Sequence, residues 1–282
     1  MTGNARLARV SRRPPVFLRR AALFCAGLVC ALVAPAAGAE FISQGRFENP
    51  VTRYGHFALG RPHEYARIFA ITDAGRSLSL ELPDNEVFED IAPRLVRLAP
   101  DEAPQLLTIV SSREAGARLA LVALHDGRLH INAQSAAIGT PMRWLNPVGV
   151  ADLDGDGRAE IAAVITPHIG GTLKVYRREG AALVEIAALG GFSNHIYGTP
   201  ELALSLTLAL TPGGKTRLLV PDTARRNLRV IALELGKLVE TARCPLRAPL
   251  TTAIAPAPPF GVSIGAGELR QLIKPGECPP PR

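Results

Sequence analysis

The chain lacks long amphipathic helical stretches, and its prolines are spread along the whole length instead of gathering in one linker. Short apolar alternations of period two, which are typical of half-buried strands, fill the sequence in place of helices. No Pro- or Gly-rich linker divides residues 40–282. The sequence therefore predicts an all-β fold in a single domain.

A charge of one sign is also lacking in most of the chain. Lys and Arg number 32 and Asp and Glu number 25, for a net charge of +7. Residues 1–39 hold six arginines and no acid, which leaves 26 basic and 25 acidic residues from Glu40 onward. A nucleic-acid binder carries a basic stripe in its folded part. None is found, so nucleic acid is excluded as a partner.

Only one long apolar run occurs, the segment "AALFCAGLVCALVA" at 21–34. An Arg-rich stretch precedes it and the small-residue pattern Ala37-Gly38-Ala39 follows it, which is the order of a secretory signal peptide. The run is shorter than the roughly 20 residues of a transmembrane helix. We predict that residues 1–39 are cleaved and that the protein is exported, periplasmic or secreted, with no membrane attachment. An uncleaved anchor is the alternative.

Cysteine is scarce, because only Cys244 and Cys278 remain after the predicted signal peptide. In an oxidising compartment two remaining cysteines favour a disulfide, here one that joins the Pro-rich C-terminal tail to the body of the domain. Two unpaired thiols are the alternative.

The apolar alternations that are present recur. Four segments, 66–82, 117–133, 171–187 and 226–242, each predict a β-hairpin around a turn glycine. From the second copy on, two short strands precede each hairpin, which gives four strands in about 50 residues, as in a propeller blade. Strand-like pieces at 56–59, 250–256 and 261–273 predict a blade shared by the two chain ends.

We therefore predict that residues 40–282 form a β-propeller of about five blades, with four to seven possible. A β-sandwich of repeated hairpins is the alternative, because four-stranded repeats do not by themselves require closure into a ring.

The third repeat contains the acidic stretch "ADLDGDGRAEI" at 151–161, with Asp152, Asp154 and Asp156 at every second position and Glu160 after them. Hard oxygen ligands at this spacing suit Ca²⁺. The flanking segments are strand-like and the twelfth position is Ala163, which excludes an EF-hand. The alternative is an acidic turn without a metal, whose aspartates cap backbone N–H groups.

The pattern Asp-x-Asp-x-Asp-Gly-x-x-(Asp/Glu) between two short strands resembles the FG-GAP/VCBS repeat, which builds β-propellers in the integrin α-subunit head and in many secreted bacterial proteins. The resemblance implies a small exported bacterial member of that family. It also implies one Ca²⁺ site, with the ligands Asp152, Asp154, Asp156, the carbonyl of Arg158, and Glu160. The equivalent loops of the second and fourth repeats have lost most or all of their acids, so a single stabilising ion is expected.

Two sequences match catalytic or phosphate-binding motifs only in part. "GVSIG" at 261–265 has no later His to serve a Ser nucleophile, and "TPGGKT" at 211–216 lacks the first glycine and the helix of a phosphate loop. We predict a strand at the first and a hairpin turn at the second.

Two loop segments between repeats, 139–146 and 190–198, supply the candidate ligand-binding residues Arg143, Trp144, Asn194 and His195. The alternative is that Trp144 and Phe192 fill the gap between blades.

No motif pairs a nucleophile or an acid with a base. We therefore predict a non-enzymatic binding or scaffold module, a monomer with an unidentified protein or glycan ligand. The alternative is a hydrolase or lyase with its site in the central channel, for which the candidate residues are His168, His195, Glu89 and Asp90.

Overall fold

The computed structural model describes residues 40–266 and 269–281. The predicted signal peptide, residues 1–39, lies outside them. Ala39–Arg282 forms one compact unit. None of the described helices is both long and apolar enough to cross a membrane.

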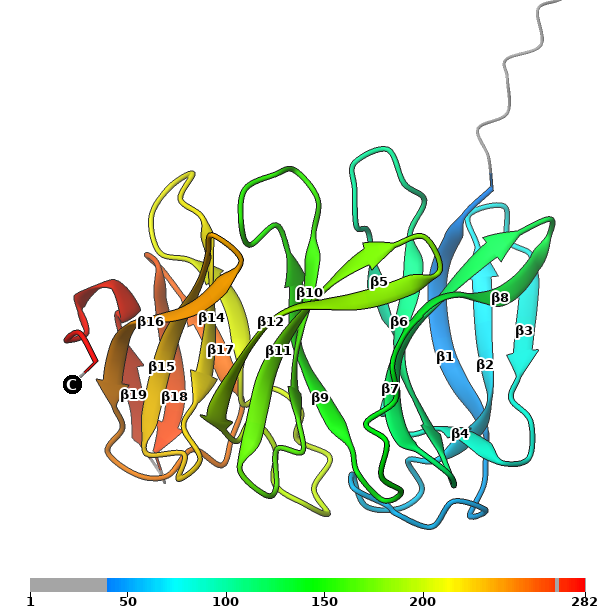
Figure 1. Cartoon of the computed structure of the whole chain (residues 1–282), viewed down its shortest axis with the longest axis horizontal. Coiled ribbons are helices and arrows are strands. Elements are labelled where there is room, and N and C mark those ends of the chain that lie inside the picture. The colour runs from blue at the N-terminus through cyan, green and yellow to red at the C-terminus, as the bar shows by residue number, and fades with distance from the viewer. Residues whose placement is uncertain (1–39, 267–268, 282) are drawn as a thin grey trace, which may run out of the picture. The chain divides into compact units, whose positions relative to one another are not determined.

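The all-β prediction is confirmed, since strands dominate the described residues and one short 3₁₀ helix, η1, is present (Figure 1). The largest sheet has twelve strands and is mixed, because β8 and β12 pair in parallel over two residues while its other pairs are antiparallel. Its strands are β1 (Ile42–Pro50), β2 (Tyr65–Thr72), β3 (Ser77–Glu81), β4 (Glu86–Phe88), β5 (Arg94–Val96), β6 (Gln105–Ser112), β7 (Gly116–His125), β8 (Arg128–Ser135), β9 (Leu145–Ala151), β10 (Glu160–Ile165), β11 (Gly171–Glu179) and β12 (Ala182–Phe192).

Two smaller antiparallel sheets complete the unit. The first has four strands, β13 (Leu206–Ala209), β14 (Thr216–Pro221), β15 (Asn227–Glu234) and β16 (Lys237–Pro245). The second has three strands, β17 (Ile254–Ala257), β18 (Gly261–Ala266) and β19 (Leu269–Ile273), and η1 (Pro275–Glu277) follows it.

All four predicted hairpins are present, as β2–β3, β7–β8, β11–β12 and β15–β16. Their turns contain Gly75, Gly127, Gly180 and Gly236, each with φ between +61° and +79°. Glycine adopts this left-handed conformation without the steric cost that a Cβ would add. "GVSIG" lies in β18 and "TPGGKT" in the β13–β14 turn region, as predicted, whereas "HFAL" at 56–59 is a loop and not a strand.

Hydrophobic clusters lie between successive groups of strands, and the central strands contribute to a cluster on each face. In β6, Leu106 and Val110 belong to the cluster with β2, whereas Leu107 and Ile109 belong to the cluster with β10. Strand β10 repeats this arrangement, because Ala162 and Val164 pack toward β14 while Ile161 and Ala163 pack toward β6. Burial on both faces explains why these strands have continuous apolar sequences.

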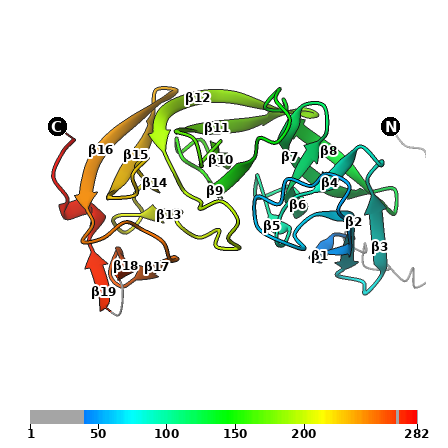
Figure 2. The ribbon, with the colours of Figure 1, turned by 90° about the horizontal axis from the view of Figure 1, so that it is seen from below.

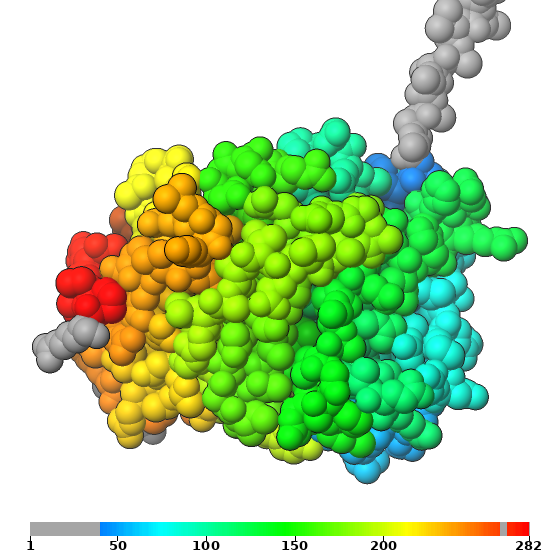
Figure 3. Space-filling view, in the orientation of Figure 1, coloured from blue at the N-terminus to red at the C-terminus, as the bar shows by residue number. Residues whose placement is uncertain are grey.

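The same packing continues to the last sheet, where Leu219 and Val230 form a cluster with Ile254 and Val262. Figure 2 shows the groups of strands following one another in chain order, from β1–β3 through β9–β12 to β17–β19, although β12 and not β9 pairs with β8. Within the described ranges no hydrophobic cluster joins β17–β19 to β1–β3. Strands β12 and β16 cover the face seen in Figure 3, and their alternating exposed side chains fit that position.

The predicted disulfide is present. Cys244 of β16 is bonded to Cys278, with Cα atoms 5.1 Å apart. The backbone N–H of Arg243 also donates to the carbonyl of Pro279 at 2.9 Å. The Pro-rich tail is therefore joined to the four-stranded sheet β13–β16.

Candidate functional site

A pocket of about 280 Å³ lies among loops that leave the same ends of successive strands. It is lined by residues of the β1–β2, β8–β9, β10–β11 and β12–β13 connections, which lie at the lower edge of Figure 1. The lining residues are His56, Met142, Arg143, Trp144, Thr166, His168, Ile169 and Tyr197. These side chains come from four distant parts of the sequence.

A buried carboxylate supports one wall of the pocket. Nδ1 of His56 lies 2.8 Å from Oε1 of Glu89, whose side chain is 0% exposed. The Ser111 hydroxyl donates to the other carboxylate oxygen at 2.6 Å, and the Ala58 N–H donates to Oε1 at 3.2 Å. A carboxylate accepts hydrogen bonds, so Nδ1–H of His56 donates to Glu89, and in the neutral imidazole this leaves Nε2 as an acceptor.

Glu64 fixes the loop that carries His56. Its buried carboxylate accepts the backbone N–H groups of Gly55, His56 and Phe57, all at 2.8–2.9 Å. The Tyr197 hydroxyl donates to the His56 carbonyl at 2.6 Å. Hydrogen bonds to the backbone of this loop therefore fix the position of His56, and Glu89 fixes its imidazole ring.

A second pair of histidines lies beside it. His195 Nε2 is 2.9 Å from the Thr199 carbonyl, and its Nδ1 is 2.7 Å from His168 Nε2. A carbonyl accepts only, so the His195 proton is on Nε2 and its Nδ1 accepts from His168 Nε2–H. Nδ1 of His168 is then an acceptor, and it has no protein partner among the described residues.

Both of these histidines are neutral near pH 7. Burial lowers the pKa of His168 to about 3, and the charges near it act in the same direction. Burial also lowers the pKa of His195 to about 4, although the hydrogen bond to the Thr199 carbonyl opposes this shift.

Aromatic rings form the remaining walls. The Trp144 indole is parallel to the His168 ring within 3°, with centroids 6.0 Å apart, and its N–H donates to the Glu89 carbonyl at 2.9 Å. Tyr197 meets His168 edge to face at 5.3 Å. Trp144 thus connects the His56–Glu89 pair with the His168–His195 pair.

Backbone strain is also found at this pocket. Thr166 has φ +50° and Met142 has φ +54°, and both line it. A β-branched residue in the left-handed region is rare and costs on the order of 1–3 kcal/mol. The Thr166 N–H donates to the Trp144 carbonyl at 2.9 Å, which helps to hold this conformation.

The predicted ligand-binding residues have different roles. Arg143 and Trp144 line the pocket. His195 is buried behind His168. Asn194 is fully buried and its amide group donates to the Asn146 carbonyl and the Ser205 hydroxyl, so it acts in packing and not at the pocket surface.

Of the candidates for the enzyme alternative, His168, His195 and Glu89 meet at this pocket. Asp90 does not, because it is paired with Arg94 at 2.6 Å, and burial raises its pKa. The sequence does not identify His56 as a site residue, because no motif marks it and its segment predicts a strand. Glu89, the partner of His56, lies 33 residues away, and no sequence pattern connects the two.

The acidic loop lies at the opposite end of β10. Ligand oxygens of Asp152, Asp154 and Asp156 come within 4.8 Å of one another, as a shared cation requires. The same side chains also cap the loop, since Asp152 accepts the N–H groups of Gly155, Asp156 and Gly157.

Glu160 is not part of that group of three carboxylates. It is buried, accepts the Leu153 N–H at 3.0 Å and pairs with Arg177 at 2.7 Å. Arg177 also pairs with Asp154 at 2.6 Å and lies 3.8 Å from Asp156. Arg158 turns its side chain away to Glu102 at 3.3 Å. The three aspartates fit a hard divalent cation, and the guanidinium of Arg177 competes with it for Asp154.

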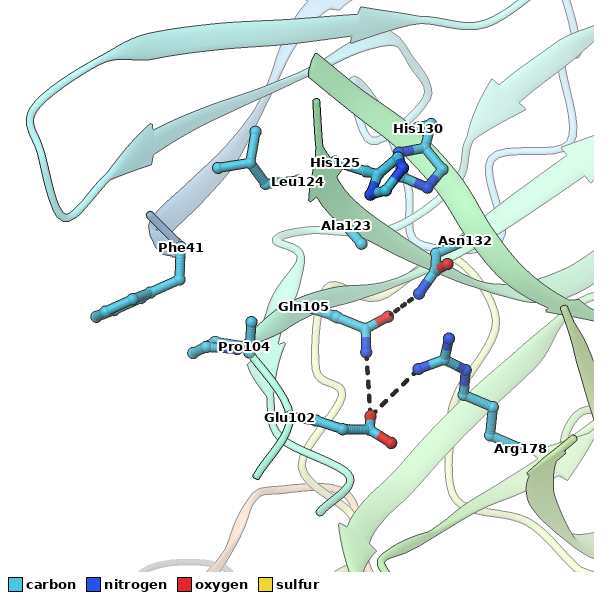
Figure 4. Close-up of a pocket in the computed structure, with 11 residues that line it drawn as sticks. Phe41, Glu102, Pro104, Gln105, Ala123, Leu124, His125, His130, Asn132 and Arg178 are labelled. Carbon is cyan, nitrogen blue, oxygen red and sulfur yellow. Dashed lines mark hydrogen bonds and ion pairs between the residues drawn. The ribbon is translucent and has the colours of Figure 1, made fainter. Parts of the chain in front are cut away.

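A further pocket of about 220 Å³ lies near the β7–β8 hairpin (Figure 4). Four of its polar side chains are bonded to one another. Gln105 accepts from Asn132 at 2.9 Å, and Glu102 pairs with Arg178 at 3.2 Å. His125 and His130, which also line it, contact each other with ring centroids 5.7 Å apart.

Neither a family model nor a curated protein matches the sequence. A solved structure from Bacteroides fragilis NCTC 9343, provisionally assigned as a 6-phosphogluconolactonase, is similar with a TM-score of 0.39 and 17% sequence identity. The match covers 74% of this chain and 60% of that one.

This neighbour contradicts the prediction of a non-enzymatic binding or scaffold module, because it is assigned as an enzyme. That prediction is withdrawn, and an enzymatic activity of this chain is a proposal. At this distance the likeness gives no information on a substrate or a mechanism.

Proposed function

We propose that the protein is a hydrolase in which His56, held by Glu89, is the general base at the pocket. The observation that supports this most strongly is the buried carboxylate–imidazole pair, whose acceptor nitrogen Nε2 belongs to a pocket-lining side chain. A positioned His of this kind contributes about 10²–10⁴-fold to the rate of a proton-transfer step.

The chemistry follows from the proton positions. His56 Nε2 takes a proton from a bound water as the water oxygen attacks the electrophilic carbon of the substrate. The imidazolium that forms is stabilised by the Glu89 carboxylate through Nδ1–H. Nε2–H then returns the proton to the leaving oxygen, which restores neutral His56. Nδ1 of His168, a second acceptor at the pocket, is available to orient the water.

The test is hydrolysis of small esters and lactones by the wild-type protein and by His56→Gln. We expect the variant to lose at least about 100-fold in kcat while it keeps its fold. Hydrolysis in ¹⁸O-water labels the acid product, whereas a lyase using the same base leaves it unlabelled. Equal rates for His56→Gln and wild type, on a substrate that the wild type turns over, would falsify the assignment.

We also propose that the successive sheets are blades of a β-propeller of about five blades related to the FG-GAP/VCBS proteins. The chain-order packing of the sheets supports this arrangement. A crystal structure in which the first and last sheets close a ring around a channel would support it, and a two-layer sandwich would exclude it.

The same proposal assigns one Ca²⁺ to Asp152, Asp154 and Asp156, with the carbonyl of Arg158 as a further ligand. A bound ion would hold the β9–β10 loop in place. We also propose that the protein is exported, because the disulfide fits an oxidising compartment.

A further inference from the structure

The charges around the pocket are unevenly distributed. Among the residues that the structure describes, no acidic side chain lines it, and Arg143 is the one lining residue with a permanent charge. The Nη1 group of Arg143 donates to the Met142 carbonyl at 3.1 Å. Among the described residues no carboxylate pairs with Arg143, and its Nε and Nη2 groups make no protein hydrogen bond. A guanidinium presents five N–H donors in a planar fork that matches an oxyanion.

A second arginine adds positive charge behind the histidines. Arg225 donates to the Ser193 hydroxyl at 3.0 Å and to the Leu250 carbonyl at 3.1 Å, and it too has no carboxylate partner in the described part of the chain. The positive charge of Arg225 helps to lower the pKa of both His168 and His195. The Glu89 carboxylate lies behind the His56 ring and accepts hydrogen bonds from three donors.

The walls select for shape. Tyr197 presents an exposed ring and His168 a half-buried one, while the buried Trp144 supports them from behind. The volume of about 280 Å³ is near the lower limit of about 300 Å³ for small-molecule pockets. The Thr166 hydroxyl is a further polar group of the lining and makes no hydrogen bond to another described residue.

We infer that the pocket takes a small, flat substrate that carries an oxyanion, a carboxylate or a phosphate, which Arg143 binds through its free N–H groups. Contact with the exposed ring of Tyr197 orients the body of the molecule toward His56. This inference rests on the proposed function, because it names the substrate class of the same site.

The chain contains one tryptophan, Trp144, so its fluorescence reports on this pocket alone. Benzoate, phenyl phosphate and phenol have the same ring and differ in charge. We expect benzoate or phenyl phosphate to change the emission at concentrations at least tenfold below those at which phenol does. Which of the two anions binds more tightly decides between carboxylate and phosphate.

Arg143→Gln should weaken the binding of the preferred anion by roughly tenfold or more and leave phenol unchanged. Arg143→Lys should keep part of the affinity. The matched control is Arg128→Gln, which removes an exposed arginine remote from the pocket and should bind as the wild type does. Equal affinity for phenol and the anions, or for Arg143→Gln and the wild type, would overturn the inference.

Turnover separates this inference from the proposed function. If the site hydrolyses esters, 4-acetoxybenzoate should show a KM about tenfold below that of phenyl acetate, and Arg143→Gln should remove that difference. If neither ester is turned over but anion binding still depends on Arg143, the binding inference stands and the hydrolase proposal fails. If both esters are turned over with equal KM in both proteins, the hydrolase stands and the anion inference fails.

Discussion

Glu89 determines which nitrogen of His56 carries the proton, and that choice makes His56 a base. A glutamine at this position keeps the shape of the side chain but carries no negative charge. Its amide oxygen would still accept from His56 Nδ1–H and the Ala58 N–H, while its NH₂ group would face the Ser111 hydroxyl. The imidazolium that forms on His56 would then lack a carboxylate partner, so the role of the Glu89 charge can be separated from simple packing.

We expect Glu89→Gln to reduce kcat by on the order of 10²–10³-fold, because the imidazolium loses its buried carboxylate partner. Ser111→Ala is the matched control, because it removes a hydrogen bond to the same carboxylate but leaves the charge. Its loss should be at least tenfold smaller. Steady-state kinetics of the two variants on one ester would measure the difference, and equal losses would contradict the role of the Glu89 charge.

The buried histidines make stability depend on pH. The pKa values of His168 and His195, about 3 and about 4, lie below the ordinary value of 6.5. Burial also lowers the pKa of His63. In the unfolded chain these groups bind protons below pH 6.5, and in the folded protein they do not. Stability is therefore complete above pH 6.5 and is lost as the pH falls toward 4.

Between pH 7.5 and pH 5 we expect a loss of about 2 kcal/mol in the free energy of unfolding, after allowance for the partial exposure of His168. Urea unfolding at the two pH values measures it. The double variant His168→Asn/His195→Asn should show a smaller pH dependence. A wild-type protein more stable at pH 5 than at pH 7.5 would rule out the buried neutral pair.

At the scale of elements, strand β7 begins at a glycine that holds the Arg143 loop. Gly116 has φ +73°, and a Cβ there would lie 2.2 Å from the Thr140 carbonyl oxygen and 3.0 Å from that of Arg143. The next residue, Ala117, donates its N–H to the Arg143 carbonyl at 3.0 Å. The start of β7 thus places the segment that carries Arg143 and Trp144.

Gly116→Ala should destabilise the protein by more than about 2 kcal/mol, because the new methyl group meets backbone that cannot move aside easily. Gly180→Ala is the control, since Gly180 also has a positive φ of +61° but has no neighbour within 4 Å of an added Cβ. Its cost should be about 1 kcal/mol. Thermal unfolding of both variants gives the comparison, and equal costs would show that the close approach is not limiting.

Arg177 of β11 supplies positive charge to the carboxylates of the β9–β10 loop that are proposed to bind calcium. For a dissociation constant of about 1 mM, 10 mM Ca²⁺ would stabilise the wild-type protein by about 1.4 kcal/mol. Arg177→Gln should be less stable without calcium and should gain more from it, since no guanidinium competes for Asp154.

Calorimetric melting with and without Ca²⁺ tests this, with Asp154→Asn as the variant that should lose the response. If calcium leaves the melting of both the wild type and Arg177→Gln unchanged, the loop is an acidic turn that Arg177 neutralises.

Sequence periodicity is sufficient to predict strands that pair with a neighbour in sequence or that are buried on both faces. The hairpins were predictable because each has alternating strands around a glycine turn, and β6 and β10 because both of their faces are buried. The site was predictable only in part. Glu89, His168 and His195 could be named as polar loop residues, but their meeting with His56 depends on loop packing, which leaves no pattern of spacing.

At the scale of the whole molecule, the disulfide joins the last segment of the chain to the four-stranded sheet β13–β16 across 34 residues. Closing a loop of that length in the unfolded chain lowers its entropy, which corresponds to about 3–4 kcal/mol of stability. The enclosed segment includes the three-stranded last sheet, which packs on β14 and β15.

The Cys244→Ala/Cys278→Ala variant should therefore lose up to about 3–4 kcal/mol in urea unfolding. Under reducing conditions the wild type should approach the variant. A variant as stable as the oxidised wild type would mean that the apolar contacts alone fix the last sheet.

The burial of β6 and β10 on both faces has a consequence for the chain before it folds. The segments "LLTIV" and "IAAVI" have no charged residue and no proline, and their β-propensity is high. Such segments pair readily with copies of themselves when they are exposed. Each is covered only when the strands on both sides of it along the sequence have been added, so incomplete chains and unfolded protein should aggregate through these two strands.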